Sequence, residues 1–207
     1  MSQDTARFIQ AINGHPLETA FLVTLFTGMR RGEIFGLTWD CVNFVAGTIT
    51  INKQLQRDPN DGSIYNLVPT KNSKSRVITP APFVMQLLRT HQRQQLEWRL
   101  RAGPAWIDDG FVFTNELGAH LSIHAVHRSY KKIVESIGLP DARFHDLRHS
   151  YAVAAIRSGD DIKTVQGNLG HATASFTLDV YGHVTDQMKR ESADRMQKYI
   201  DRIKQSG

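Results

Sequence analysis

Residues 48–79 read TITINKQLQRDPNDGSIYNLVPTKNSKSRVIT, and this stretch decides the fold class because β-forming residues dominate it. Thr48–Ile51 alternates between polar and apolar residues, and Ile64–Val68 makes a second strand after the turn at Asp58–Gly62. A third strand, Arg76–Thr79, follows another polar turn. The stretch therefore predicts a small three-stranded antiparallel sheet.

Helical patterns lie on both sides of this sheet, and residues such as Gly28, Pro82, Gly103 and Gly159 mark where helices start or stop. We expect helices over residues 4–12, 16–28, 30–37, 82–101, 122–137, 145–158, 161–168 and 185–204. Gly167 is a poor helix former within one of them. The sequence thus predicts one α+β domain, mostly helical, over residues 1–207.

Composition bounds the function only loosely. The chain has 207 residues, a formal net charge of +5 and a pI near 9.5, which favours a polyanionic partner weakly. Cys41 is its single cysteine, so an intrachain disulfide and a thiolate metal cluster are excluded, and we expect a buried, inert thiol. No apolar run approaches the roughly 18 residues of a membrane span, and no signal segment opens the chain. We expect an intracellular protein with no membrane partner.

Two arginines are candidates for binding an anion. Arg30 lies in the turn Thr27–Glu33, where Glu33 follows one helical turn later and can hold its guanidinium. Arg148 lies three residues after His145 at a helix N-terminus, where free N–H groups favour an anion. Arginine can bind two phosphate oxygens at once. Each pair also has a structural interpretation, as surface ion pairs and a helix cap.

Tyr181 is the candidate nucleophile, ten residues after the histidine of Leu169-Gly-His171. A free phenol has a pKa of about 10, so it needs a base or cationic surroundings to attack a phosphate. The two arginines, His145 and His171 can supply both. A core tyrosine on a helix is the alternative.

Lys71 lies at or beside the second turn of the predicted sheet. A cationic hairpin tip can enter a DNA groove or donate a proton, and a solvated turn is the alternative. Lys74 and Arg76 nearby are predicted contacts to the DNA backbone, which add affinity without reading base sequence. Further predicted DNA contacts are Arg31, His124 and Arg128.

Histidines also allow a metal interpretation, because His120, His124 and His127 have helical ligand spacing in part. No Asp, Glu or Cys supports them at matching offsets. The sequence also lacks a Gly-rich phosphate loop and an acidic cluster for magnesium. We therefore expect no metal site and no cofactor.

Five segments, taken in order, resemble the catalytic domain of the tyrosine recombinases, the family of phage integrases, Xer-type recombinases and conjugative-transposon integrases. They are TGMRRGE (27–33), TK (70–71), HDLRH (145–149), LGH (169–171) and DVYGH (179–183). Each is a weak signal alone, whereas all five in this order, over nearly the whole chain, are specific. Their style is most similar to integrases of phages and conjugative transposons.

The resemblance implies the chemical step. Tyr181 matches the nucleophile that forms a 3′-phosphotyrosyl bond and releases a 5′-hydroxyl. Lys71 matches the general acid for the departing 5′-oxygen. The energy of the broken bond stays in the tyrosyl ester, so strand exchange requires neither ATP nor metal.

The resemblance also implies the phosphate-binding residues. Arg30 and Arg148 match the pair that binds the non-bridging oxygens. His145 and His171 match positions that assist proton transfer and hold the phosphate. Glu33 matches an acidic position that supports the first arginine.

The function implied is that of a site-specific DNA recombinase, an integrase that cuts and rejoins double-stranded DNA at attachment sites during integration or excision of a mobile element. Its implied location is the cytoplasm of a bacterium. An Xer-like chromosome-resolution recombinase, a topoisomerase of type IB and a non-cleaving DNA-binding regulator on the same fold are alternatives.

Relatives usually carry an N-terminal core-binding domain, and often an arm-binding domain before it. We therefore expect residues 1–207 to be a catalytic domain excised from a longer protein. Relatives also dock their C-terminal segment on a neighbouring protomer in a cyclic tetramer on DNA. We expect the helix at about 185–205 to pack in this way in the full-length protein, and accessory DNA-bending or directionality factors to take part. The isolated domain is expected to be a monomer.

Overall fold

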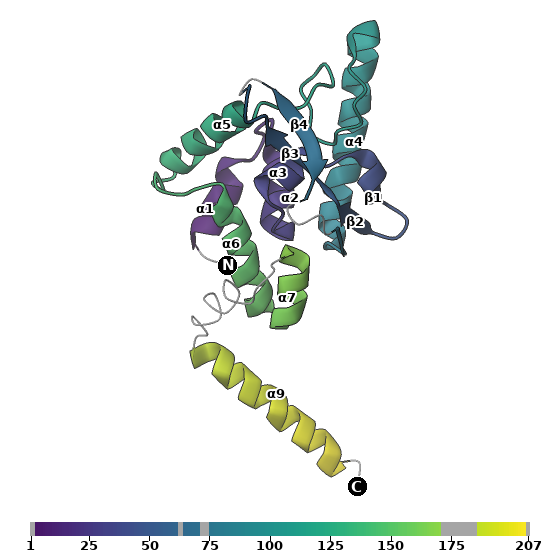
Figure 1. Ribbon diagram of the computed structural model, residues 1–207. Helices are drawn as coiled ribbons and strands as arrows, with labels where there is room; N and C mark the ends of the chain where they lie inside the picture. Colours follow the sequence, from purple (N-terminus) through teal and green to yellow (C-terminus); the bar gives the residue numbers. More distant parts are fainter. Residues whose placement is uncertain (1–2, 62–63, 71–74, 171–185, 206–207) are drawn as a thin grey trace.

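The computed structural model describes residues 3–61, 64–70, 75–170 and 186–205 of the chain (Figure 1). Its helices are α1 (Gln3–Ala11), α2 (Glu18–Thr27), α3 (Arg31–Phe35), α4 (Pro82–Ala102), α5 (Ile123–Ser136), α6 (His145–Ser158), α7 (Ile162–Leu169) and α9 (Asp186–Gln205). Its strands are β1 (Val42–Asn43), β2 (Thr48–Ile51), β3 (Lys53–Arg57), β4 (Tyr65–Pro69) and β5 (Arg76–Ile78). The mostly helical α+β class is confirmed, and the predicted helices match within about two residues at each end.

A three-stranded antiparallel sheet is present, but its strands differ from the predicted set. β2 pairs with β1 on one side and with β5 on the other, in the order β1-β2-β5. The second predicted strand, β4, pairs instead with β3 in a separate two-stranded sheet. The prediction that residues 64–68 belong to the three-stranded sheet was therefore wrong.

Asn52 separates the two sheets. The residue interrupts the strands between β2 and β3, and its carbonyl accepts a hydrogen bond from Thr70 N at 3.1 Å. Its side-chain oxygen lies 3.4 Å from Cys41 Sγ. These contacts hold the chain where it leaves the first sheet, so β3 and β4 form their own hairpin.

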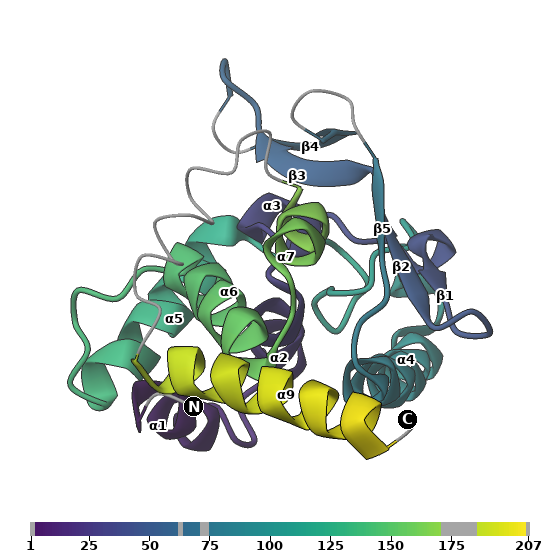
Figure 2. The same cartoon turned by 90° about the horizontal axis from the view of Figure 1, so that it is seen from below.

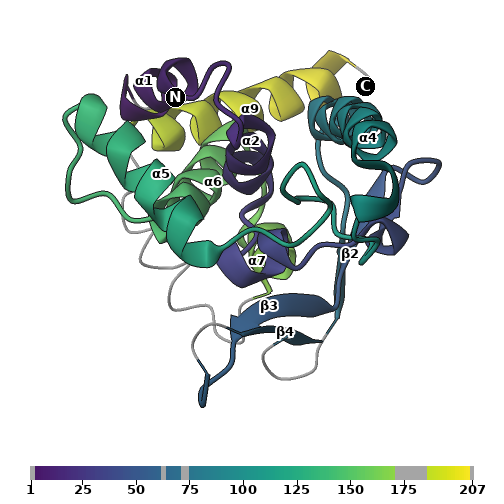
Figure 3. The ribbon, with the colours of Figure 1, turned by 90° about the horizontal axis from the view of Figure 1, so that it is seen from above.

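α2 lies at the centre of the domain. It is apolar on nearly every side, as expected for a helix that neighbours surround, and it packs against both α4 and α6. Figures 2 and 3 show α1, α5 and α6 on one side of α2, with α4 and the β1-β2-β5 sheet on the other. Phe21 on α2 makes ring contacts with Phe8, Tyr130 and Phe144, so one aromatic cluster joins α1, α2, α5 and the start of α6.

Helix ends follow the predicted signals. Ser122 accepts a hydrogen bond from Ala125 N as the N-cap of α5, and Asp161 accepts one from Thr164 N as the N-cap of α7. Gly28 ends α2 in the left-handed region with φ of 65°. Cys41 is buried, as predicted. Within the described ranges, no helix combines the length and apolar character that crossing a membrane requires.

Gly167 and Gly28 give opposite predictions for substitution by alanine. Gly167 lies on α7, is exposed, and has open space where a Cβ would be added. We expect Gly167→Ala to raise the free energy of unfolding by about 0.5–1 kcal/mol, because glycine costs that much in a helix interior.

A Cβ on Gly28 would lie 2.5 Å from Tyr151 Cδ1 and 2.6 Å from Leu169 Cδ2, at a positive φ. Gly28→Ala should therefore destabilise the domain by more than Gly167→Ala stabilises it. Urea unfolding followed by circular dichroism measures both. A loss of stability in Gly167→Ala would show that α7 is not a regular helix at that position.

Candidate active site

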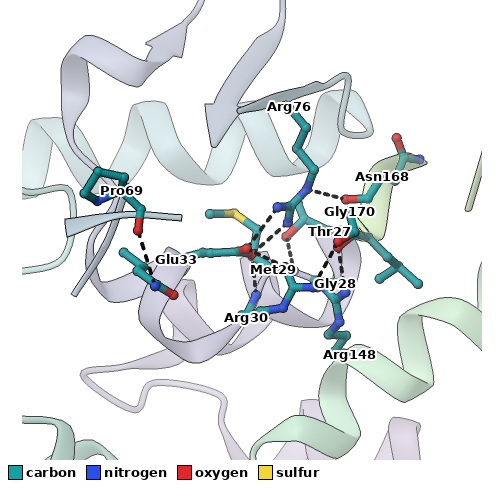
Figure 4. A network of polar contacts seen from close by, with 12 residues as sticks. Thr27, Gly28, Met29, Arg30, Glu33, Pro69, Arg76, Arg148, Asn168 and Gly170 are labelled. Atoms are coloured by element: carbon teal, nitrogen blue, oxygen red, sulfur yellow. Dashed lines mark hydrogen bonds and ion pairs between the residues drawn. The ribbon is translucent and has the colours of Figure 1, made fainter. Parts of the chain in front are cut away.

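Three arginines from different elements converge on one helix end, and two of them also bond one carboxylate. Arg30 precedes α3, Arg76 begins β5, and Arg148 lies in the first turns of α6. The carboxylate belongs to Glu33 on α3, and the helix end is the C-terminus of α7. Figure 4 shows these groups and the bonds between them. The predicted pair Arg30 and Arg148 is therefore brought together.

Glu33 is 1% exposed and is satisfied by four donors. Its Oε1 accepts from Arg30 Nη1 at 2.7 Å and from Arg76 Nη1 at 2.9 Å. Its Oε2 accepts from the Arg30 backbone N at 2.8 Å and from Arg76 Nη2 at 2.7 Å. Burial alone would raise the pKa of Glu33, but the bonds and charges of Arg76 and Arg30 lower the pKa to about 2. Glu33 is therefore ionised at neutral pH, and its predicted support of Arg30 is a direct bond.

Arg30 retains access to solvent, with its side chain 36% exposed. One of its terminal nitrogens bonds Glu33, and Nη2 donates to the carbonyl of Gly170 at 3.0 Å. An exposed guanidinium anchored on one side can meet an anion on the other. The geometry therefore leaves part of the Arg30 guanidinium accessible to a further acceptor.

Arg148 is 1% exposed. Its Nη1 donates to the carbonyl of Gly28 at 2.5 Å and its Nη2 to the carbonyl of Leu169 at 2.6 Å, whereas Nε has no hydrogen-bond partner among the residues that the structure describes. Burial and the charge of Arg30 lower the pKa of Arg148 to about 9, which leaves the guanidinium charged at neutral pH. A buried donor without a partner costs free energy, so this nitrogen favours an acceptor such as a phosphate oxygen.

The C-terminal end of α7 receives one bond from each arginine. Arg76 Nε donates to Asn168 O at 2.8 Å, Arg148 Nη2 to Leu169 O and Arg30 Nη2 to Gly170 O. The last carbonyls of a helix lack intrahelical partners and carry partial negative charge, so cations stabilise them. The chain reaches His171 in the next residue, which places that predicted site residue next in sequence to the cluster.

The TGMR turn requires a glycine at position 28. Its positive φ ends α2, and the side chains of Tyr151 and Leu169 fill the space where a Cβ would lie. The same turn exposes its carbonyl to Arg148. The turn therefore packs α6 and α7 against α2 while it holds one of the arginines.

Tyr151 is a second phenol beside this cluster. Its Oη accepts a hydrogen bond from Asn168 Nδ2 at 3.0 Å, and burial raises its pKa. A raised pKa makes the phenolate rarer at neutral pH, so Tyr151 is a poor nucleophile. It packs α6 against α7.

His145 is the first residue of α6. Partial burial lowers its pKa, the charges of Arg148, Arg30 and Arg143 lower it further, and Asp146 opposes them. The imidazole is therefore neutral at neutral pH. A neutral imidazole can accept a proton, which fits the predicted role in proton transfer.

The cluster of charged side chains carries a net positive charge. Three guanidiniums and one carboxylate leave two net positive charges around the end of α7. Charge at a desolvated site acts more strongly than in water. A cluster with this net charge favours the binding of an anion.

The remaining predicted residues fall into two groups. Arg31, His124 and Arg128 are exposed, on α3 and α5, and their predicted DNA contacts stay predictions. His124 and Arg128 are four residues apart on α5, so they share one face. Residues outside the described ranges are Lys71, Lys74, His171 and Tyr181.

The sequence analysis did not predict that Arg76 bonds groups within the protein. Arg76 was predicted to contact the DNA backbone, but all three of its guanidinium nitrogens donate to protein acceptors. The alternation of side chains along β5 could have predicted this, because Arg76 shares a face of the strand with Ile78, which is 3% exposed. A charged residue on a core-facing position requires a buried partner.

Among the described residues, no group of three or more His, Cys, Asp or Glu side chains could hold a metal ion. His124 and His127, two of the histidines with partial ligand spacing, are exposed on α5.

A model of the phage integrase family matches residues 2–188. The chain belongs to this family, and its fold is that of a tyrosine recombinase catalytic domain. A tyrosine recombinase XerC-like protein of Caldanaerobacter subterraneus is 31% identical over 205 residues, which cover 94% of this chain and 52% of that protein. ICEBs1 integrase of Bacillus subtilis is 29% identical over 198 residues, with 94% and 52% covered. The chain spans about half the length of the curated relatives it matches.

Solved structures show the same fold. The Tn1549 transposon integrase in complex with transposon right end DNA matches with a TM-score of 0.75 and 22% identity, over 95% of this chain and 65% of that one. The catalytic domain of bacteriophage HP1 integrase matches with a TM-score of 0.58 and 19% identity, over 88% and 85%. Both agree with the predicted fold class.

Glu33 should make stability depend on pH in the acidic range. Its pKa is about 2 in the folded protein against an ordinary value of 4.5. This difference corresponds to roughly 3 kcal/mol of stability, present above pH 4.5 and lost as the pH falls towards 2. We expect the difference in unfolding free energy between the native chain and Glu33→Gln to shrink by this order between pH 5 and pH 2.

The comparison isolates Glu33, because other carboxylates titrate equally in both proteins. Asp146→Asn, which removes an exposed carboxylate at the start of α6, is the matched control and should show a much smaller change. A difference that stays constant with pH would contradict the ionised, buried state of Glu33.

Proposed function

We propose that this chain is the catalytic domain of a site-specific DNA recombinase, which cuts and rejoins strands through a covalent 3′-phosphotyrosyl intermediate. The observation that carries the proposal is the convergence of Arg30 and Arg148 beside the end of α7, with Glu33 fixing one of them. Phosphoryl transfer depends mainly on positioning and charge stabilisation. Two guanidiniums held by a folded scaffold supply both without a metal or cofactor.

In the proposed step, the oxygen of Tyr181 attacks the scissile phosphorus. A bond forms between that oxygen and phosphorus, and the bond between phosphorus and the 5′-oxygen breaks. His145, neutral at neutral pH, accepts the phenolic proton with help from His171, and Lys71 protonates the departing 5′-oxygen. The reverse step, in which a 5′-hydroxyl attacks the tyrosyl ester, rejoins the strand.

The arginines act on the phosphate throughout this step. Arg30 offers the partly exposed guanidinium, and Arg148 offers a buried one whose Nε has no partner within the described ranges. Their charge stabilises the pentacoordinate transition state, and one well-placed arginine can contribute roughly 10³–10⁵ in rate.

Relatives support the substrate and the setting of the reaction. The Tn1549 transposon integrase is solved with DNA, and other relatives are named as integrases of a Bacillus element and of Staphylococcus phage L54a. We infer that the partner is double-stranded DNA, that the chain acts in the bacterial cytoplasm, and that the reaction moves an element in or out of a chromosome.

We further propose that the longer protein forms a tetramer on DNA, with the C-terminal helix packed on a neighbouring protomer. α9 supports this, because several of its apolar side chains are exposed: Met196 59%, Tyr199 61%, Ile200 37% and Ile203 56%. A helix with an apolar side uncovered favours a protein partner. The N-terminal DNA-binding domain expected from the resemblance belongs to the same proposal.

The test uses a randomised library of nicked duplexes, in which a cleaved strand loses the fragment that would reverse the reaction. We expect a covalent protein–DNA adduct, stable in SDS, whose recovered DNA defines a preferred sequence. Tyr181→Phe should abolish the adduct, because it removes the attacking oxygen. Adduct yield on denaturing gels measures the effect.

Tyr151→Phe is the matched control, since it removes the phenol that lies beside the arginines. It should retain adduct formation. An adduct that survives Tyr181→Phe but not Tyr151→Phe would assign the nucleophile to Tyr151. A chain that binds DNA but forms no adduct with any duplex would instead be a non-cleaving regulator.

A further inference from the structure

Arg76 occupies a position that β5 turns towards the interior. Val77 is 62% exposed, whereas Ile78 is 3% exposed and the Arg76 side chain is 12% exposed. Side chains alternate along a strand, so Arg76 faces inward with Ile78. An arginine in this register is expensive to bury unless every donor has a defined partner.

The partners of Arg76 belong to two different elements. Its Nη1 and Nη2 donate to the two oxygens of Glu33 at 2.9 and 2.7 Å, and its Nε donates to Asn168 O at 2.8 Å. The paired bonds to Glu33 require the planar fork of a guanidinium. A single ammonium nitrogen cannot span the same acceptors. Arg76 therefore ties α3 to the end of α7 through geometry as well as charge.

Arg76 bonds one of the two groups that hold Arg30 and packs beside the other. Arg30 bonds the Glu33 carboxylate and the Gly170 carbonyl. Arg76 bonds the same carboxylate, and a Cβ on Gly170 would lie 2.9 Å from Arg76 Cδ and Nη1. Loss of Arg76 would free one side of Glu33 and open the space beside Gly170. The direction of the Arg30 guanidinium depends on both contacts.

We propose that Arg76 is a positioning residue for strand cleavage: it sets the direction of Arg30 through Glu33 and the end of α7, and it does not contact DNA. This inference rests on the proposed recombinase function. The competing role is the DNA-backbone contact predicted from the sequence.

The two roles make different predictions for binding and for chemistry. A positioning residue affects the cleavage step, and misplacing a catalytic group by about 1 Å can cost roughly 100-fold in rate. A phosphate contact affects affinity, and each one adds about 0.9 to the slope of log affinity against log salt. Substitution by lysine also distinguishes the two roles. Lysine can contact a phosphate, but it cannot make the paired bonds of the guanidinium to Glu33.

The experiment measures two quantities for the native chain, Arg76→Gln and Arg76→Lys. DNA affinity is measured by fluorescence anisotropy on a labelled duplex at several salt concentrations. The single-turnover cleavage rate is measured at saturating concentration of the nicked duplex that the library selects. Arg93→Gln, which removes an exposed arginine of α4, is the control for loss of one charge.

We expect both Arg76 variants to lose about 100-fold in cleavage rate. The affinity and salt slope of Arg76→Gln should equal those of Arg93→Gln, and those of Arg76→Lys should equal those of the native chain. Combining Arg76→Gln with Glu33→Gln should lower the rate by less than the product of the single losses, because both act through one contact. Circular dichroism checks that the variants fold. If Arg76→Gln does not fold, the cleavage rate of Arg76→Lys, which keeps the charge, distinguishes the two roles.

Three results would overturn the inference: an unchanged cleavage rate in both variants, a salt slope reduced by about 0.9 in Arg76→Gln and restored by lysine, or losses that multiply fully with Glu33→Gln. Failure of the proposed function looks different. In that case the native chain forms no adduct, while the affinity measurements still show whether Arg76 contacts DNA.

Discussion

The buried carboxylate of Glu33 is the constraint on which the rest of the site depends. A carboxylate that is 1% exposed is costly unless donors surround it, and here two guanidiniums and a backbone N–H do so. The hydrogen bonds to the Glu33 carboxylate require that β5 place Arg76 beside it and that the turn before α3 place Arg30 there. One buried charge thus fixes the relative positions of a strand, a turn and a helix.

Much of this could be predicted locally. The TGMRRGE turn, the helix starting at His145 and the glycine ends of α2, α6 and α7 are set by neighbours in sequence, and each lies where the pattern predicts it. The bond between Arg30 and Glu33 is also local, since three residues separate them on one helical turn. Side chains with a strong preference for one position leave a signature that a single sequence displays.

What could not be predicted depends on backbone acceptors far along the chain. Arg148 bonds Gly28 O across 120 residues, and Arg30 bonds Gly170 O across 140. Every residue has a carbonyl, so no residue type marks which one an arginine will choose. The division of the sheets at Asn52 is similar, because the residue lies in a continuous β-forming run and acts through its contacts with Thr70 and Cys41. Tertiary contacts overrode local preference there.

The same hydrogen bonds to backbone carbonyls restrict how far the guanidiniums can move. Arg148 has both terminal nitrogens bound to carbonyls at the ends of α2 and α7, and each of the three guanidinium nitrogens of Arg76 donates a hydrogen bond, so moving either guanidinium would break two or three hydrogen bonds. Arg30 combines an anchored side with an exposed one. Charges fixed in advance need little reorganisation when a reaction develops further charge, which is the main source of electrostatic catalysis. The hydrogen bonds of the folded chain thus fix the direction of the arginines in advance, and the energy of folding holds them there.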